Sequence, residues 1–167
     1  VLITGISCFL GYYLVKNIPD AQEITGVYHQ HKPDYLNEVY QCDISNTQSL
    51  NELLLKVRPT GIIHLAAASN PAFCQENPEI SEAINIKASS VLAKYAAQLK
   101  IPFVFTSTDL VFDGKKGHYN ENDKPKPLNI YGKQKMMVEE KIRMIYPDAA
   151  ICRMPLMLGN APGFPDK

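Results

Sequence analysis

The sequence predicts an α/β fold built on a doubly wound parallel sheet. Three observations predict it: short apolar runs rich in Val, Ile, Phe and Tyr, amphipathic stretches between them, and the regular alternation of the two along the chain. Strands that helices cover on both faces have continuous apolar sequences of this kind. Such a sheet carries its ligand sites at the carboxyl ends of its strands.

Length and composition indicate one globular domain, which we assign to residues 1–167. The chain is 46% hydrophobic and 20% charged, and 17 basic residues balance 17 acidic ones. A net charge of zero gives no electrostatic reason to expect nucleic acid or a membrane surface as a partner. Without an apolar run of roughly 18 to 20 residues or a signal-type segment, the chain is expected in the cytoplasm.

The predicted strands and helices follow in order along the chain. One helix is capped by Ser45 or Asn46 and ends before Pro59, and a longer one runs from about Glu79 to Lys100, before Pro102. The segment 113–129 has the Gly, Pro, Asn and charge content of an exposed loop. The strands are predicted to end near Thr4, Tyr28, Asp43, Ala67, Thr108 and Arg153. The apolar face of the long helix is predicted to comprise Ile80, Ala83, Ile84, Ala88, Val91, Leu92, Tyr95 and Leu99.

The four cysteines are widely separated, with no pair or nearby histidine at zinc-ligand spacing, so we expect no metal site. Cys42 and Cys152 lie in or beside strand-like runs and are expected to be small buried hydrophobic residues. The same interpretation applies less strongly to Cys74.

The segment TGISCFLG, residues 4–11, is predicted to join the first strand to the first helix by a tight turn. A dinucleotide-binding turn needs a first glycine for the turn, a middle one for approach to the pyrophosphate, and a last one for helix packing. Gly5 and Gly11 meet two of these needs, whereas Cys8 replaces the middle glycine. We therefore expect weakened but retained dinucleotide binding. An ordinary strand-to-helix turn is the alternative.

The second strand ends in GVYHQHK and carries no acidic residue at its end. A carboxylate there binds the ribose 2′-hydroxyl of NAD and repels a 2′-phosphate. His29, His31 and Lys32 are instead available to meet a phosphate, and the first acid, Asp34, follows Pro33. We expect NADPH to bind at least as well as NADH, with a solvated basic loop as the alternative.

Tyr131 and Lys135 lie four residues apart, on one face of a helix predicted to open near Asn129. A lysine ammonium beside a phenol stabilises the phenolate, and we expect it to lower the pKa of Tyr131 so that the phenol exchanges a proton with a substrate oxygen. The hydroxyl of Thr108, at a strand end, completes the set. A solvated helix face is the alternative for this spacing taken alone.

Together these segments resemble the extended short-chain dehydrogenase/reductases, and in particular their dTDP-4-dehydrorhamnose reductase-like branch. The likeness covers nearly the whole chain, in TGISCFLG, CDISN, HLAAAS, STDLVFDG, PLNIYGKQK and CRMPLMLG. Dehydratases of the family usually have Thr-Asp-Glu where this chain has Thr-Asp-Leu. Epimerases more often have Val-Tyr-Gly where this chain has Ile-Tyr-Gly. The resemblance implies a Rossmann fold and a reductase.

The resemblance also implies a role for each matching residue. Tyr131 would be the general acid, Lys135 would hold the nicotinamide ribose, and Thr108 would orient the substrate. Asn85 would support Lys135 through water, with local backbone groups as its alternative partners. Asp43 would lie beside the adenine, with capping of the next helix as the alternative. The residues assigned to the cofactor are Gly5, Ser7, Cys8, Phe9, Leu10, Gly11, His29, Lys32, Asp43, Ile44, Leu65, Ala66, Ala67, Ala68, Thr106, Tyr131, Lys135 and Pro155.

The expected function is NAD(P)H-dependent reduction of a nucleotide-linked 4-keto sugar, with NADP as cofactor and NAD as its alternative. A non-catalytic NADP-binding relative of the methionine adenosyltransferase regulatory subunit, and an epimerase or dehydratase, are the other readings. Val138 departs from the usual glycine, which concerns packing or subunit contact. Because the family continues into a substrate-binding portion, we interpret the chain as a fragment, and a homodimer is an assembly to test.

Overall fold

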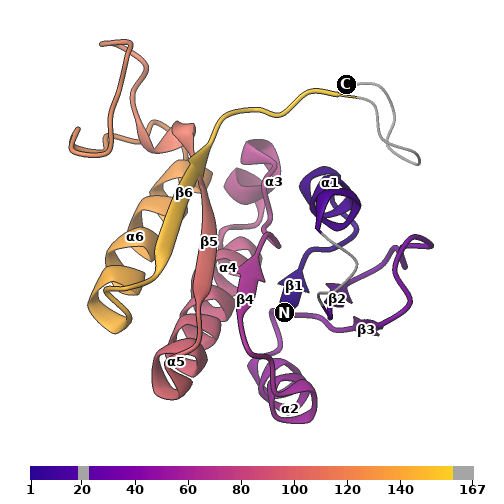
Figure 1. The fold of residues 1–167 in the computed structure, drawn as a ribbon. Coiled ribbons are helices and arrows are strands. Elements are labelled where there is room, and N and C mark those ends of the chain that lie inside the picture. Colours follow the sequence, from indigo (N-terminus) through magenta and orange to yellow (C-terminus); the bar gives the residue numbers. More distant parts are fainter. Residues whose placement is uncertain (19–22, 160–167) are drawn as a thin grey trace.

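The computed structural model describes residues 1–18 and 23–159, so residues 19–22 and 160–167 of the predicted domain lie outside it. Its six strands form one parallel sheet in the order β3-β2-β1-β4-β5-β6 (Figure 1). Successive strands are added on one side of β1 up to β3 and on its other side from β4 onward. Doubly wound folds bind ligands at this switch point between β1 and β4. The strands are β1 Leu2–Thr4, β2 Thr25–Tyr28, β3 Val39–Gln41, β4 Ile62–His64, β5 Phe103–Thr108 and β6 Ala150–Met154.

Helices cover both faces of this sheet, which confirms the doubly wound architecture. Leu2 and Ile62 point into a core shared with α2, α5 and α6, whereas the next residues, Ile3 and Ile63, pack on α1 at the opposite face. The helical segments are α1 Phe9–Asn17, α2 Thr47–Val57, α3 Pro71–Glu76, α4 Pro78–Glu82, the π-helical η1 Ala83–Ala88, α5 Ser89–Leu99, the 3₁₀ turn η2 Asp109–Val111 and α6 Ile130–Ile145. None of the helices within the described ranges is long and apolar enough to cross a membrane.

The strand ends are confirmed with small shifts. β1, β2 and β5 end at the predicted residues, and β6 ends one residue beyond Arg153. β3 and β4 end at Gln41 and His64, before the predicted Asp43 and Ala67. The carboxyl ends of all six strands lie at one edge of the sheet, which brings the segments after them together.

The predicted long helix contains a π-helical turn, and two of the residues assigned to its apolar face are exposed. η1 separates α4 from α5, and a π turn holds an extra residue relative to an α turn. Ser81 is buried, whereas Ile80 is 53% exposed, so the assignment of Ile80 to the apolar face is wrong. Leu99 is also wrongly assigned, because it ends α5 and is 54% exposed.

The second helix begins as one of the predicted alternatives requires. Asn46 caps α2 by accepting from the N–H groups of Gln48 and Ser49, at 3.1 Å each. The carboxylate of Asp43 instead accepts from the backbone N–H and hydroxyl of Ser45, so its alternative role as helix cap is wrong.

The cysteines differ in their burial. Cys42 is buried as expected, and Cys74 is buried as well. Cys152 is exposed, so its predicted burial is wrong. It lies on β6, which pairs with β5 alone among the strands of residues 1–18 and 23–159. The loop 113–129 is mostly exposed as predicted, with Tyr119 stacked on Phe112.

Candidate active site

The opening turn is built around two glycines that admit no side chain. Gly5 has φ +69°, and a Cβ there would lie 2.7 Å from the backbone nitrogen of Ala66. A Cβ on Gly11 would overlap the carbonyl oxygen of Ile6. The turn therefore packs directly against α1 on one side and against the loop after β4 on the other. This places two of the predicted cofactor segments in contact.

Cys8 occupies the turn without straining its backbone. Its φ of −87° and ψ of 166° are open to any residue, so a glycine is not needed there for conformation. The residue caps α1, because its Sγ accepts from the backbone N–H of Gly11 at 3.3 Å. Burial raises the pKa of the Cys8 thiol, which keeps it protonated at neutral pH. The thiol thus occupies one of the N–H groups at the N-terminus of α1. In dinucleotide-binding turns, these N–H groups bind phosphate.

The loop that carries His29 and Lys32 is fixed to the opening turn by Tyr35. The hydroxyl of Tyr35 donates to the Ile6 carbonyl at 2.6 Å, and its ring meets Tyr12 edge-on at 5.1 Å. Burial raises the pKa of Tyr35 to about 12. His29 and Lys32 are exposed, as a pair meeting a ligand phosphate would need to be. Nothing in the sequence marks a lone loop tyrosine for this role.

Asn85 holds the loop after β4. Its Oδ1 accepts from the Ala68 N–H at 2.9 Å, and its Nδ2 donates to the Ala68 carbonyl at 3.1 Å and to Gln134 Oε1 at 2.8 Å. These are the local backbone contacts given above as the alternative. Support of Lys135 through water stays a prediction. Asn85 sits in the π-helical η1, which sets its side chain toward this loop.

A buried histidine lies beneath the same loop. His64 Nδ1 is 2.6 Å from the Thr4 hydroxyl, and its Nε2 is 2.8 Å from that of Ser89. Burial, helped by the charge of Lys135, lowers the pKa of His64 to about 3. The ring is therefore neutral at pH 7 and joins β1, β4 and α5 by hydrogen bonds.

Thr108, Tyr131 and Lys135 gather where β5 meets α6. Thr108 ends β5, and its hydroxyl oxygen accepts from the Leu110 N–H at 3.2 Å. Gly132 follows Tyr131, and a Cβ on it would overlap the Leu110 carbonyl oxygen, so α6 packs directly on this turn. α6 opens next to Asn129 as predicted, and the Asn129 side chain caps it by accepting from the N–H of Gly132.

The pKa of Tyr131 is not lowered as the sequence predicts. Burial raises it to about 12, the charge of Cys74 adds to the increase, and a hydrogen bond with Thr108 opposes it. The expectation is wrong for this structure because Lys135 Nζ donates to the Thr106 carbonyl at 2.6 Å. The ammonium lies 4.3 Å from the ring centroid of Phe105 and 6.0 Å from that of Tyr131.

Lys135 is itself strongly affected by its surroundings. Burial lowers its pKa to about 7, and the charge of Glu139 opposes this shift. Lys135 and Glu139 lie one turn apart on α6, and Glu139 is fully buried. The site therefore contains a lysine whose charge changes near neutral pH.

An ion pair between Glu139 and Arg153 joins α6 to β6. Arg153 donates to the carboxylate through Nε at 3.0 Å and Nη2 at 2.7 Å, and the Ser107 hydroxyl donates at 2.5 Å. Burial raises the pKa of Glu139, but Arg153 and Ser107 more than offset this, and the pKa lies below its ordinary value. Val138, beside it, is fully buried in the core, in line with a packing role.

Some predicted cofactor residues can offer only their backbone. The side chains of Ile44 and Leu65 are buried in the core, so these residues would meet a cofactor through backbone atoms, and their assignment stays a prediction. Thr106 donates its hydroxyl to the His64 carbonyl at 2.9 Å. The remaining predicted residues that lie on the surface or partly on it are Ser7, Phe9, Leu10, Asp43, Ala66, Ala67, Ala68 and Pro155.

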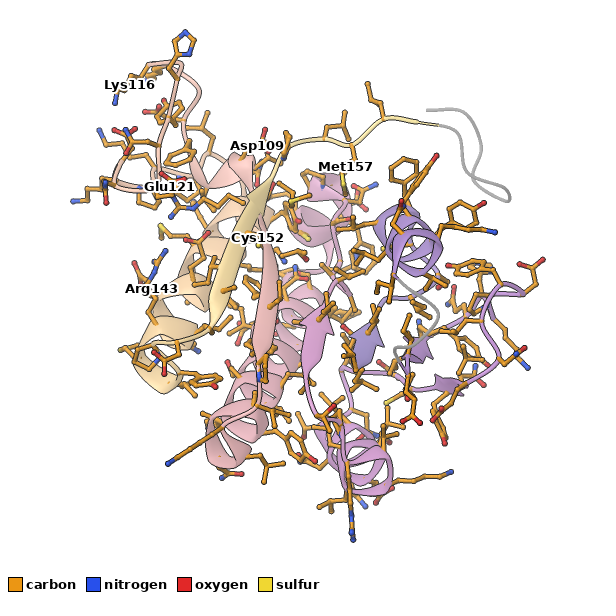
Figure 2. The ribbon with its side chains drawn as sticks, in the orientation of Figure 1. Asp109, Lys116, Glu121, Arg143, Cys152 and Met157 are labelled. Atoms are coloured by element: carbon orange, nitrogen blue, oxygen red, sulfur yellow. The ribbon has the colours of Figure 1, made fainter. Side chains whose placement is uncertain are left out.

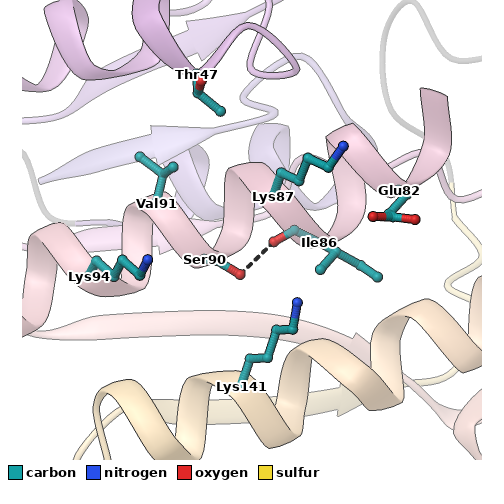
Figure 3. Close-up of a pocket in the computed structure, with 8 residues that line it drawn as sticks. All are labelled: Thr47, Glu82, Ile86, Lys87, Ser90, Val91, Lys94 and Lys141. Carbon is teal, nitrogen blue, oxygen red and sulfur yellow. Dashed lines mark hydrogen bonds between the residues drawn. The ribbon is translucent and has the colours of Figure 1, made fainter. Parts of the chain in front are cut away.

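Two surface hollows differ in their relation to this site. One, of about 390 Å³, adjoins Thr108 at the carboxyl end of β5, and Asp109 and Glu121, labelled in Figure 2, are among the residues that line it. The other, of about 320 Å³, lies across α2, α4, η1, α5 and α6 (Figure 3). It is lined by Thr47, Glu82, Ile86, Lys87, Ser90, Val91, Lys94 and Lys141, none of which is a predicted site residue.

A family model described as RmlD substrate binding domain matches residues 1–164. A probable low-salt glycan biosynthesis reductase, Agl14, of Haloferax volcanii is 35% identical over 159 residues, which cover 94% of this chain and 53% of that protein. Methionine adenosyltransferase 2 subunit beta of Danio rerio is 32% identical over 162 residues, covering 96% and 48%. The chain thus spans about half the length of these relatives.

Solved structures agree with the fold. A hypothetical dTDP-4-dehydrorhamnose reductase from Sulfolobus tokodaii superposes with a TM-score of 0.84 at 32% identity, covering 92% of this chain and 55% of that one. The dTDP-4-dehydrorhamnose reductase of Bacillus anthracis, solved in complex with NADP, gives 0.78 at 25% identity, covering 92% and 52%.

Proposed function

Because the chain belongs to the family described as RmlD substrate binding domain, we propose that it forms part of an NAD(P)H-dependent reductase of a nucleotide-linked 4-keto sugar. The observation that carries this proposal is the convergence of Thr108, Tyr131 and Lys135 at the end of β5, on the same sheet edge as the opening turn. The names of the reductases in Haloferax volcanii and Sulfolobus tokodaii support it. The proposed activity is that of a protein of the relatives' length, of which this chain spans about half.

The residues at this edge fit a dinucleotide. The end of α1 offers backbone N–H groups and a favourable dipole for the phosphates, and Gly5 allows the turn to pack against Ala66. His29 and Lys32 would meet a 2′-phosphate, which makes NADP the proposed cofactor and NAD the alternative. The NADP in the related Bacillus anthracis structure supports this choice. When bound, the reduced cofactor supplies a hydride to the substrate carbonyl carbon.

Tyr131 is the proposed proton donor to the carbonyl oxygen. A phenol whose pKa is about 12 is fully protonated at neutral pH, as a general acid must be before it reacts. Thr108 lies beside it and would orient the carbonyl with its hydroxyl. Lys135, in its charged form, would favour the phenolate that remains after proton transfer and would hold the cofactor ribose.

Turnover by the full-length protein tests this function. NADPH oxidation is followed in the presence of dTDP-linked and UDP-linked 4-keto sugars, and the reduced sugar is identified by mass. We expect NADPH-dependent reduction of at least one of them. Binding of NADPH without turnover of any keto sugar would contradict the proposal.

A regulatory protein is the second candidate. The 32% identity to methionine adenosyltransferase 2 subunit beta supports it, as does Cys8, whose thiol caps α1 where the phosphates would approach. Stable association with a methionine adenosyltransferase catalytic subunit, without keto-sugar turnover, would favour this reading. An epimerase or dehydratase is less well supported, because Leu110 stands where the dehydratases have glutamate.

A homodimer and a cytoplasmic location remain proposals. Sedimentation of the full-length protein would measure the first, and fractionation of cells that express it would measure the second.

A further inference from the structure

Gln134 is a buried amide on α6, three residues after Tyr131 and directly before Lys135. Its side chain is turned toward α4 and η1, and the residue is 5% exposed. Its Nε2 donates to the Ser81 hydroxyl at 2.8 Å and, more weakly, to the Pro78 carbonyl at 3.4 Å. Its Oε1 accepts from Asn85 Nδ2 at 2.8 Å. One side chain thus meets three partners on the neighbouring helical segment.

The neighbouring groups determine which way each amide faces. Asn85 Oδ1 accepts from the Ala68 N–H, so its nitrogen must face Gln134, which then presents oxygen. The Ser81 hydroxyl donates to the Pro78 carbonyl at 3.1 Å and keeps a lone pair for Gln134 Nε2. Every donor in this hydrogen-bond network around Gln134 and Asn85 has an acceptor. Reversing either amide would bring two donors or two acceptors together.

The chain of contacts ends at the loop after β4. The Asn85 side chain forms hydrogen bonds with both the N–H and the carbonyl of Ala68. Ala66, in the same loop, packs against Gly5 of the opening turn. Gln134 therefore links α6, which carries the reacting phenol and the lysine, to the loop on which the cofactor would lie.

We propose that Gln134 is a positioning residue that sets α6 at a fixed distance from the Ala66–Ala68 loop. The proposal rests on the reductase function given above. Removal of the Gln134 amide leaves a buried N–H of Asn85 with only the weak acceptor Cys74 Sγ, 3.9 Å from Nδ2, and the Asn85 amide then turns toward that sulfur. It releases Ala68, and the cofactor loop moves relative to Tyr131. Small misplacement of reacting groups lowers the rate of the chemical step more than it weakens binding.

Hydrogen exchange and kinetics on the full-length protein test this role. Gln134→Met keeps the length of the side chain and removes both amide functions. We expect exchange of the Ala68 amide to rise about tenfold, while amides of β5 keep their rates. We also expect kcat for reduction to fall about tenfold, with KM for NADPH within about twofold of its original value.

Two further variants set the scale. Ser81→Ala removes only the outer contact and should raise Ala68 exchange by about threefold. Gln48→Met alters an exposed glutamine on α2 that bonds to Glu52 at 2.9 Å, and it should change neither measurement. If Gln134→Met does not fold, Ser81→Ala decides by the same criteria.

Unchanged exchange at Ala68 would overturn the proposal, whatever the activity. A uniform rise in exchange over the whole chain would also overturn it, because Gln134 would then only support the fold. If the unaltered protein reduces no keto sugar, the reductase function fails, while the exchange at Ala68 still decides whether Gln134 links α6 to the loop.

Discussion

The β1–α1 turn and the β5–α6 pair contribute to the same sheet edge through different kinds of atoms. At the turn, the groups that would meet a cofactor are backbone N–H groups at the end of α1, held by the close packing at Gly5 and Gly11. At β5–α6, the proposed reacting groups are side chains: a hydroxyl, a phenol and an ammonium. The turn departs from its family pattern at Cys8, whereas Thr108, Tyr131 and Lys135 all match theirs.

The two regions show that a match to a sequence motif and the geometry of a site are separate properties. Cys8 departs from the motif, but its own backbone has an ordinary extended conformation. Lys135 matches its motif, yet its ammonium donates a hydrogen bond to the Thr106 carbonyl and lies farther from the Tyr131 ring than from the Phe105 ring. A site made of backbone tolerates a small side-chain change. A site made of side chains depends on neighbours that the motif does not include.

Loss of the phenol should have the largest effect. Tyr131→Phe removes the proton donor from the β5–α6 side, and we expect kcat for reduction by the full-length protein to fall at least about a hundredfold. Cofactor affinity, which depends mainly on the turn, should change little. Steady-state kinetics and calorimetric titration with NADPH measure the two effects. Equal turnover of every keto substrate by Tyr131→Phe would exclude the assignment.

The charge of Lys135 should set the pH dependence. Its pKa of about 7 means that the charged form is present below pH 7 in the free protein and is lost as the pH rises through that value. If the charged form is the active one, kcat/KM should fall about tenfold per pH unit above 7. Tyr131, with a pKa of about 12, stays protonated over this range.

A matched variant separates this charge from other titrating groups. Lys135→Arg keeps a positive charge over the whole range and should remove the decline, at a lower overall rate. Lys135→Ala should impair both turnover and cofactor binding. A flat profile between pH 6 and 9 for the unaltered protein would contradict the role given to this lysine.

Cys8→Gly should have a smaller effect, on the other side of the comparison. Removal of the thiol releases the Gly11 N–H for a phosphate oxygen, and we expect the dinucleotide Kd to fall about three- to tenfold. Cys8→Ser keeps a side-chain acceptor at the same place and serves as the control, with little change expected. Calorimetry that found no gain for Cys8→Gly would show that the thiol does not compete with the ligand.

The preference between NADPH and NADH should be the smallest effect. We expect NADPH to bind at least as well as NADH at low salt, by up to about threefold, and the ratio to approach one as salt rises. Lys32→Gln should remove most of this preference, whereas Lys94→Gln, on α5, should not. A clear preference for NADH would mean that a carboxylate reaches the ribose from another part of the fold.

The parts of the fold that were predictable depend on local pattern. Short apolar runs located the strands, and Asn46 and Asn129 cap their helices as their sequences indicate. Thr108 and Tyr131 were predictable as neighbours because Thr108 ends β5 and Tyr131 lies in the first turn of α6, the next long helix along the chain. The exposure of Cys152 was not, because it depends on β6 being the last strand of the sheet. The partner of Lys135 depends on where α6 settles against β5, which no spacing records.

The π-helical turn at Ala83–Ala88 also governs how this helical segment tolerates changes in length. A π turn is an α-helix with one residue inserted, so deletion of one residue there would restore an unbroken 3.6-residue period without breaking the chain of backbone hydrogen bonds. The extra residue is accommodated within the turn itself, so the parts on either side would keep their orientation relative to one another. Ser81 would stay on the inner side as the partner of Gln134. Loss of one residue at this turn should therefore be tolerated better than loss of one residue within α5, where every residue before the deletion would rotate by about 100° relative to those after it.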